Sequence, residues 1–223
     1  MTDTSFMPQI VAETDRWWVI NKPPGWLTIP GRSGSDVPVL QEWLAQQVGM
    51  SGGQKPWVVH RIDKDTSGLL IFAKTAEAHA WACSAFENRK VSKRYDALVW
   101  EKPPVLKTLS MPLIRVDLPI EGKSSVTQVE VKKRYRQGSG AWVRARIFTG
   151  RRHQIRIHLS SLGYPLLGDL QYGGFREVPE LGIPIERVAL HASELELPGG
   201  EKYSVPIPAD FQYWMNALEK GTR

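Results

Sequence analysis

The stretch from His60 to Leu70, HRIDKDTSGLL, contains the residue best suited to carry chemistry, the carboxylate of Asp63. Asp63 stands between Arg61 and Lys64, and opposite charge close by favours the ionised form of a carboxylate. The apolar run LLIFA at 69–73 follows a turn-like segment and predicts a buried strand. An ionised carboxylate in a loop beside a rigid strand can act as a nucleophile or a general base, and it can equally form a structural ion pair.

Four segments of the sequence match the motifs of one enzyme family, in the family's order. The segment around Asp63 resembles the HRLDxxTSG signature of the RluA-type pseudouridine synthases, with Ile62 in place of the usual leucine. The other three matches are NKPPG at 21–25, SKRYDALV at 92–99 and TGRRHQIRIHL at 149–159. We expect no separate RNA-binding module ahead of these motifs. The chain thus resembles the compact form of the family, without an N-terminal S4 domain.

The resemblance implies an isomerase that converts uridine to pseudouridine in RNA without a metal or another cofactor. The reaction breaks the N1–C1′ bond, rotates the uracil and forms a C5–C1′ bond. A fixed carboxylate can stabilise the positive charge at C1′ or attack covalently, and one is enough because no water is activated. Asp63 matches the family's catalytic aspartate, Arg156 matches the arginine that pairs with it, and Tyr95 matches the active-site tyrosine. Arg152, one helical turn before Arg156, is the alternative partner.

Several cations flank the motifs and are expected to contact RNA. The net charge of +6 and the isoelectric point of about 9.5 suit a polyanionic partner, and phosphate contacts dominate affinity for nucleic acids. The enzyme must take its target nucleotide out of the stack, and the resemblance supports Arg61 as the residue that fills the vacated space. The remaining RNA-contacting cations are expected to be Lys22, Lys93, Arg94, Arg151 and Arg152. If these cations line one cleft, RNA binding will depend strongly on salt.

The resemblance also suggests the RNA targets. It is closest to the compact enzymes that act on a stem-loop of 23S rRNA and on anticodon stem-loops of tRNA, and NKPPGWLTIPGR at 21–32 contributes to it. We expect the protein to be a monomer in the cytoplasm.

Other functions fit the same residues less well. A catalytically inactive RNA-binding protein would use the same basic cleft, but binding alone requires none of Asp63, Tyr95 and Arg156. A nucleoside hydrolase would usually need a second carboxylate. A metal site built from Asp63 and histidines lacks an HExxH motif, and the isomerisation needs no Lewis acid. The histidines in question are His60, His153, His158 and His191.

The residue patterns predict more strands than helices. The predicted strands are 10–12, 17–20, 57–59, 69–73, 95–100, 127–131, 141–148, 189–197 and 203–207. The predicted helices are 39–48, one after Thr75 as N-cap, a short one between Arg152 and Gly163, and a last one capped by Asp210. This order without strict βα alternation indicates an α+β fold. The resemblance adds a bent, mostly antiparallel mixed sheet with flanking helices and a catalytic cleft across one face.

The length of 223 residues suits one catalytic domain over 10–223 after a flexible tail at 1–9. A single cysteine, Cys83, excludes an internal disulfide and a cysteine-only metal site. No stretch approaches eighteen consecutive apolar residues, and the N-terminus lacks the pattern of a secretory signal.

Overall fold

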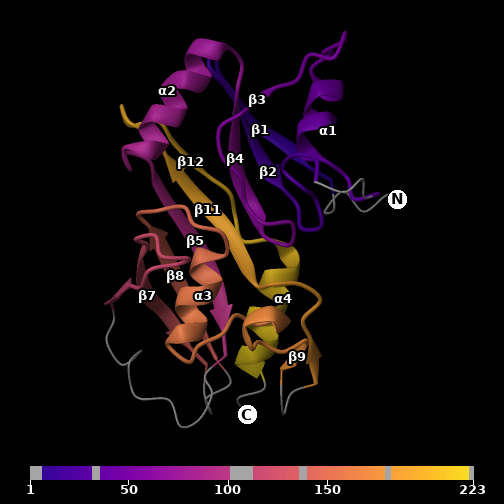
Figure 1. Cartoon of the computed structure of the whole chain (residues 1–223). Coiled ribbons are helices and arrows are strands. Elements are labelled where there is room, and N and C mark those ends of the chain that lie inside the picture. Colours follow the sequence, from indigo (N-terminus) through magenta and orange to yellow (C-terminus); the bar gives the residue numbers. More distant parts are fainter. Residues whose placement is uncertain (1–6, 32–35, 101–112, 136–139, 179–181, 221–223) are drawn as a thin grey trace. The chain divides into compact units, whose positions relative to one another are not determined.

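The computed structural model describes residues 7–31, 36–100, 113–135, 140–178 and 182–220 (Figure 1). The chain forms two compact units. Unit 1 contains the chain up to Val91 together with Glu194–Val205, and unit 2 contains Ser92–Ser193 together with the chain from Pro206 onward. The registered strand pairs within each unit are antiparallel, and helices accompany the strands in both units. The predicted α+β class with mostly antiparallel strands is confirmed, while the bend and the cleft stay predictions.

The central strand of unit 1 is β4 (Ser67–Ala73), which is buried over its whole length. It pairs with β2 (Trp17–Lys22) and, at its end, with β3 (Trp57–Val58), and β2 pairs in turn with β1 (Gln9–Glu13). Because both faces of β4 are covered, it is a continuous apolar run rather than an alternating one. This strand is the rigid element that follows Asp63.

Two helices complete unit 1, α1 (Leu40–Gln47) and α2 (Ala76–Glu87). The hydroxyl of Thr75 accepts a hydrogen bond from the amide of Ala78 at 3.2 Å, so the predicted N-cap is confirmed. Figure 1 shows α2 beside β3 and β4, where its alanines join the core formed by Trp17, Val19, Leu69 and Ile71.

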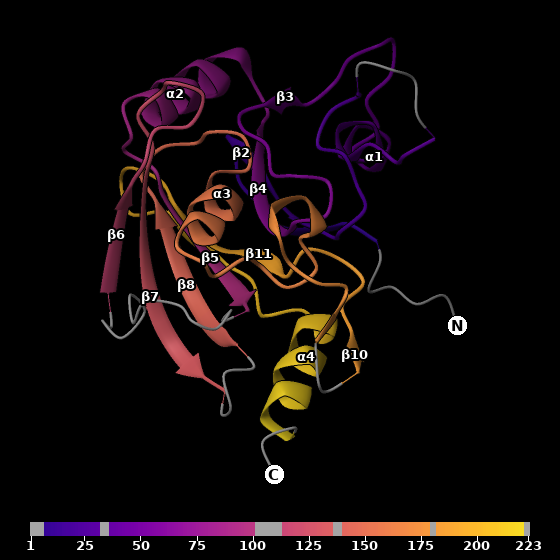
Figure 2. The ribbon, with the colours of Figure 1, turned by 60° about the horizontal axis from the view of Figure 1, so that its bottom comes forward.

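The sheet of unit 2 has the order β5-β8-β7-β6. The bounds of these strands are Ser92–Val99 for β5, Leu113–Asp117 for β6, Val126–Arg134 for β7 and Ala141–Ile147 for β8. The alternating residues of β8 are buried and accessible in turn, as predicted. Helix α3 (Gln154–Ser161) lies over this sheet (Figure 2). Strand β6 was not predicted from the sequence.

The remaining elements of unit 2 are the 3-10 turn η4 (Leu170–Tyr172), the short strands β9 (Glu177–Val178) and β10 (Ile183–Pro184), and helix α4 (Ala209–Lys220). The sequence predicted Asp210 as the N-cap of the last helix. This prediction is wrong, because the helix begins one residue earlier, at Ala209. Asp210 lies inside the first turn, and its carboxylate accepts two hydrogen bonds from Arg187, at 2.7 and 3.0 Å.

The predicted hairpin at 189–207 is confirmed as β11 (Leu190–Glu196) and β12 (Lys202–Ser204). Residues 1–6 of the predicted tail lie outside the described residues, and β1 begins at Gln9. The single domain over 10–223 stays a prediction. In the described ranges, no helix has the length and apolar character needed to cross a membrane.

Candidate active site

Asp63 lies in the loop between β3 and β4 and is half-buried. Its carbonyl oxygen accepts a hydrogen bond from the amide of Thr66 at 3.1 Å, which closes the turn into β4. The preceding residue, Ile62, is buried, and its carbonyl accepts a hydrogen bond from the hydroxyl of Thr28 at 3.3 Å. The main chain is therefore fixed on both sides of the Asp63 carboxylate.

The upstream NKPPG segment, residues 21–25, is hydrogen-bonded to the same loop. The ammonium of Lys22 donates to the carbonyls of Pro23, Trp26 and Lys64 at 2.9, 3.0 and 2.8 Å. The amide of Gly25, at a left-handed φ of +84°, donates to the same Lys64 carbonyl at 2.9 Å. The prediction that Lys22 contacts RNA is wrong, because its side chain is fully buried and its three N–H bonds already have main-chain acceptors.

The two residues before Ile62 differ in their surroundings. The ring of His60 stacks on Phe86 with 4.6 Å between centroids, and its Nε2 accepts a hydrogen bond from the amide of Ile71 at 3.3 Å. His60 therefore packs the loop against unit 1. The side chain of Arg61 is exposed. Its accessibility agrees with an RNA contact, which stays a prediction.

The side chains of the predicted site residues in β5, Lys93, Arg94 and Tyr95, point to two different faces of the sheet. Tyr95 is registered with Ala145 and Lys93 with Ile147, whereas Arg94 between them is registered with Arg146. Successive side chains of a strand point to opposite faces, so Lys93 shares the face of Tyr95 and Arg94 does not. Arg94 therefore lies on the face of β5 opposite to Tyr95 and Lys93, and its RNA contact stays a prediction.

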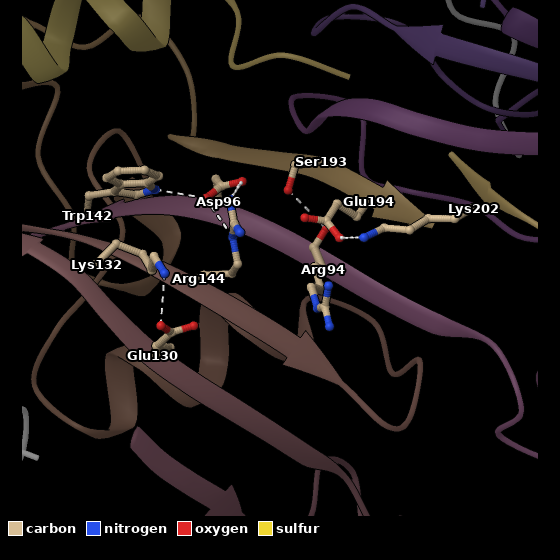
Figure 3. Close-up of polar contacts among 9 residues, drawn as sticks. All are labelled: Arg94, Asp96, Glu130, Lys132, Trp142, Arg144, Ser193, Glu194 and Lys202. Atoms are coloured by element: carbon tan, nitrogen blue, oxygen red, sulfur yellow. Dashed lines mark hydrogen bonds and ion pairs between the residues drawn. The ribbon is translucent and has the colours of Figure 1, made fainter. Parts of the chain in front are cut away.

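The face of Arg94 also carries a buried carboxylate. Asp96 is fully buried and accepts hydrogen bonds from the indole of Trp142 at 2.8 Å and from Arg144 at 3.3 and 3.4 Å (Figure 3). On the same face, Lys132 pairs with Glu130 at 2.9 Å. The charged side chains of these two ion pairs are Asp96, Arg144, Glu130 and Lys132. None of them matches a catalytic position of the family.

Lys93 lies beside the loop that leads into α3. Its ammonium is 3.7 Å from the position that a Cβ atom would occupy on Gly150. Burial of this ammonium lowers the pKa of Lys93 to about 8. Lys93 and Tyr95 thus share a face of β5, and Lys93 reaches the TGRRHQIR segment.

Polar side chains fix that segment and α3 to strand β7. The buried amide oxygen of Gln154 accepts hydrogen bonds from the hydroxyl of Thr149 at 2.6 Å and from the amide of Arg151 at 3.1 Å. Its NH₂ group donates to the carbonyl of Val126 at 3.0 Å. The buried His158 is 2.8 Å from the Thr127 hydroxyl, and burial lowers the pKa of His158. The sequence analysis did not assign Gln154 a role.

The three arginines of this segment have distinct surroundings. Arg151 is half-buried and its Nε donates to the carbonyl of Ser124 at 3.2 Å. Arg152 is exposed and precedes α3. Arg156 is buried within α3, with 8% of its surface exposed. Arg152 therefore remains a candidate for RNA contact, and Arg156 is the most buried of the three arginines.

Arg156 forms a two-pronged ion pair with a residue that the sequence analysis did not identify. Its Nε and Nη2 donate to the two carboxylate oxygens of Asp169 at 2.7 and 2.8 Å. Nη2 also donates to the side-chain oxygen of Gln171 at 3.2 Å, and the guanidinium lies 5.0 Å from the ring centroid of Tyr172. The signal in the sequence was an acidic residue inside GDLQYGG, a turn with glycines at both ends.

Three of the four histidines of the metal alternative contact other groups. Nδ1 of His153 is 3.0 Å from the hydroxyl of Tyr172, and His60 and His158 bind main-chain or hydroxyl groups as described. Within the part of the chain that the structure describes, no three His, Cys, Asp or Glu side chains gather as metal ligands would.

Comparison with known proteins identifies the family. Residues 16–161 match the family described as RNA pseudouridylate synthase. Ribosomal large subunit pseudouridine synthase D of Pseudomonas aeruginosa is 33% identical, over 95% of this chain and 72% of that protein. The enzyme of the same name from Vibrio parahaemolyticus is 34% identical, over 96% of this chain and 71% of its own length.

A solved structure has the same fold. Human RNA Pseudouridylate Synthase Domain Containing 4 matches with a TM-score of 0.73 and 22% identity, over 94% of this chain and 92% of that one. The family match spans Asp63, Tyr95 and Arg156. This chain therefore belongs to the RNA pseudouridylate synthase family, the enzymes that isomerise uridine to pseudouridine in RNA.

Proposed function

We propose that Asp63 is the catalytic carboxylate of this enzyme and that Tyr95 and Arg156 are its other catalytic residues. The observation that carries this assignment is the anchoring of the Asp63 loop. Hydrogen bonds to the carbonyls of Ile62, Asp63 and Lys64 hold three consecutive residues in place. A carboxylate held in this way does not have to be reordered during the reaction.

The proposed reaction keeps the uracil on the enzyme throughout. The N1–C1′ bond breaks, the base rotates, and C5 bonds to C1′, after which C5 loses its proton to solvent and N1 carries a proton. Asp63 acts by adding to C1′ or C6, or by assisting elimination to a glycal. The Tyr95 phenol packs against the uracil and takes part in proton transfer or hydrogen bonding. The Arg156 guanidinium orients the carboxylate and favours its ionised form.

The RNA must present the uridine outside its stack. Arg61 is exposed and only two residues before Asp63, which supports its role as the side chain that fills the vacated space. Lys93, Arg151 and Arg152 are the proposed phosphate contacts, because they lie on or beside the segments that carry Tyr95 and Arg156.

We assign the substrate to large-subunit ribosomal RNA, and tRNA stem-loops are a second substrate class. The relatives from P. aeruginosa and V. parahaemolyticus are ribosomal large subunit pseudouridine synthases by name, which supports the first assignment. The enzyme acts as a monomer in this proposal. Mapping pseudouridines in RNA from cells that lack the protein tests the substrate assignment, since the modified positions that disappear identify the target.

The catalytic assignment is tested by tritium release from RNA labelled at C5 of uracil. The wild type releases tritium, and Asp63→Asn loses turnover at least about 1,000-fold because an amide is neither a nucleophile nor an anion. Asp65→Asn is the matched control, since Asp65 lies in the same loop and pairs with Lys64 at 3.9 Å, and we expect its rate within about threefold of wild type.

Other outcomes contradict the proposal in distinct ways. Appreciable turnover by Asp63→Asn removes this carboxylate from the mechanism. Release of free uracil by the wild type indicates hydrolysis instead of isomerisation. RNA binding by the wild type without tritium release from any tested RNA indicates an inactive binding protein.

A further inference from the structure

The guanidinium of Arg156 is contacted on several sides by one short segment of unit 2. Asp169 accepts two hydrogen bonds from it, Gln171 accepts a third, and the ring of Tyr172 lies below the cation. Asp169 has 1% of its surface exposed and Arg156 has 8%. The orientation of the guanidinium plane is therefore set by a fixed, desolvated partner.

The segment around Asp169 has a tightly determined main chain. Gly168 has a φ of +77°, and a Cβ atom there would lie 2.0 Å from the carbonyl oxygen of Arg187. A Cβ atom on Gly174 would lie 2.0 Å from the carbonyl oxygen of Leu166. Contacts this short are impossible for a real side chain, so only glycine fits at both ends of the segment.

Two hydrogen bonds close the segment and attach it to α3. The amide of Gly174 donates to the carbonyl of Asp169 at 2.8 Å, and the hydroxyl of Ser160 donates to the carbonyl of Tyr172 at 2.6 Å. Ser160 lies one turn after Arg156 in α3. The carboxylate and the arginine that it binds are thus attached to the same helix by independent contacts.

We propose that Asp169 is a positioning residue, which fixes Arg156 in the orientation needed for the reaction. This proposal rests on the catalytic role of Arg156 in the proposed function. An arginine side chain has many rotamers, and a carboxylate that binds Nε and Nη2 together defines the plane of the guanidinium. Because Nε and Nη2 are bound to Asp169, the orientation of the remaining Nη1 edge of the guanidinium is also fixed. That edge is the one proposed to interact with the catalytic carboxylate or the substrate.

The competing explanation is that the pair only stabilises the fold. Unit 2 offers a matched control for it in Asp96 and Arg144, another buried carboxylate bound by an arginine through Nε and Nη2. Asp96 lies on the face of β5 opposite to Tyr95. A purely structural role predicts that Asp169→Asn and Asp96→Asn behave alike.

The test measures single-turnover tritium release at saturating enzyme, the Kd for the same RNA, and thermal unfolding of each variant. Asp169→Asn is expected to slow the chemical step about 100-fold, since a displacement near 1 Å can have an effect of that size, with a Kd within about threefold of wild type. Asp96→Asn is expected to lower the Tm. At temperatures below that Tm, its single-turnover rate should equal that of the wild type. In an Arg156→Ala background, adding Asp169→Asn slows the reaction no further, because the two residues act as one unit.

Arg156→Lys extends the test if Asp169→Asn does not fold. Lysine keeps the charge but cannot form the two-pronged contact, so this variant is expected to be nearly as slow as Arg156→Ala. The proposal is overturned if Asp169→Asn keeps the wild-type rate, if its rate loss only follows unfolding, or if Arg156→Lys is close to wild type. An active Arg156→Ala variant, or an inactive wild type, instead refutes the proposed function itself.

Discussion

The ammonium of Lys22 donates a hydrogen bond to the carbonyl of Lys64, the residue directly after Asp63, at 2.8 Å. A lysine from the second strand of unit 1 thereby holds the loop that carries the candidate nucleophile. The charge of this lysine is satisfied by main-chain oxygens in the interior and not by a phosphate.

We expect Lys22→Met to reduce stability rather than weaken RNA binding. The apolar replacement removes the buried ammonium that donates to the carbonyls of Pro23, Trp26 and Lys64, although the Lys64 carbonyl keeps the amide of Gly25 as a second donor. We expect the free energy of unfolding to fall by about 2–4 kcal/mol. Urea unfolding measures this change, and salt-titrated RNA binding below the unfolding transition should give the wild-type slope. Lys55→Met is the control, because Lys55 is exposed and pairs with Glu42 at 3.6 Å. A reduced slope with unchanged stability would restore Lys22 as an RNA contact.

The opposite faces of Lys93 and Arg94 give a second prediction. If RNA binds on the face of Tyr95, Lys93→Met lowers the slope of log K against log salt by about one at pH 7, and Arg94→Met leaves it unchanged. Because the pKa of Lys93 is about 8, the wild-type slope should also fall toward that of Lys93→Met as the pH rises above 8. Equal slopes for the wild type and Lys93→Met at pH 7 would exclude Lys93 from the RNA contact.

Arg61→Ala is predicted to separate binding from turnover. If Arg61 replaces the extruded nucleotide in the stack, the variant binds a stem-loop with nearly the wild-type Kd but has a single-turnover rate at least about tenfold lower. Lys55→Ala is the control, because Lys55 lies outside this loop in the sequence, is exposed and pairs with Glu42 at 3.6 Å. A normal rate for Arg61→Ala would discard the role in nucleotide flipping.

His191 predicts a pH dependence of stability. It is buried in β11, and burial, assisted by the positive charge of Arg187, lowers the pKa of His191 to about 4. The unfolded chain therefore binds one more proton than the folded chain between pH 4 and 6.5. The contribution of the neutral side chain is complete above pH 6.5 and is lost as the pH falls to 4, an effect of about 3 kcal/mol.

Urea unfolding of the wild type and His191→Gln at several pH values measures this effect. The difference in unfolding free energy between the two proteins should change by about 3 kcal/mol between pH 6.5 and pH 4, in the direction that favours the variant at low pH. A difference that does not vary with pH would show that His191 is not held in its neutral form.

Local patterns predicted the parts of the fold whose periodicity was clear. The apolar run at 69–73 is the core of β4, and the alternation at 141–147 is the whole of β8. A helical period of 3.6 residues would place Trp81 of α2 on the same inward face as Ala82, but Trp81 has 38% of its surface exposed. Its ring lies 5.0 Å from the Arg16 guanidinium instead, an amphipathic arrangement that periodicity alone does not describe.

The candidate site was predictable where a motif was specific and was not predictable where three-dimensional contacts decide. Asp63 follows from its motif, whereas the role of Lys22 depends on carbonyls that lie up to 42 residues away in the sequence. Arg94 and Lys93 occupy opposite faces of β5, which was not predictable because the predicted strand began at residue 95 and included neither of them. Asp169 could not be assigned to Arg156, because nothing in the sequence indicates which acidic residue a buried arginine will bind.

Unit 1 is made from two separate pieces of the chain, and this has a consequence for its synthesis. Leu195, Leu197 and Val205 belong to its core, and Glu201 accepts a hydrogen bond from the indole of Trp17 at 3.0 Å. A nascent chain therefore completes all of 92–193 before it can close the unit with which it began. Contacts between such distant segments form slowly, and a product truncated before Glu194 would leave part of this core open to aggregation.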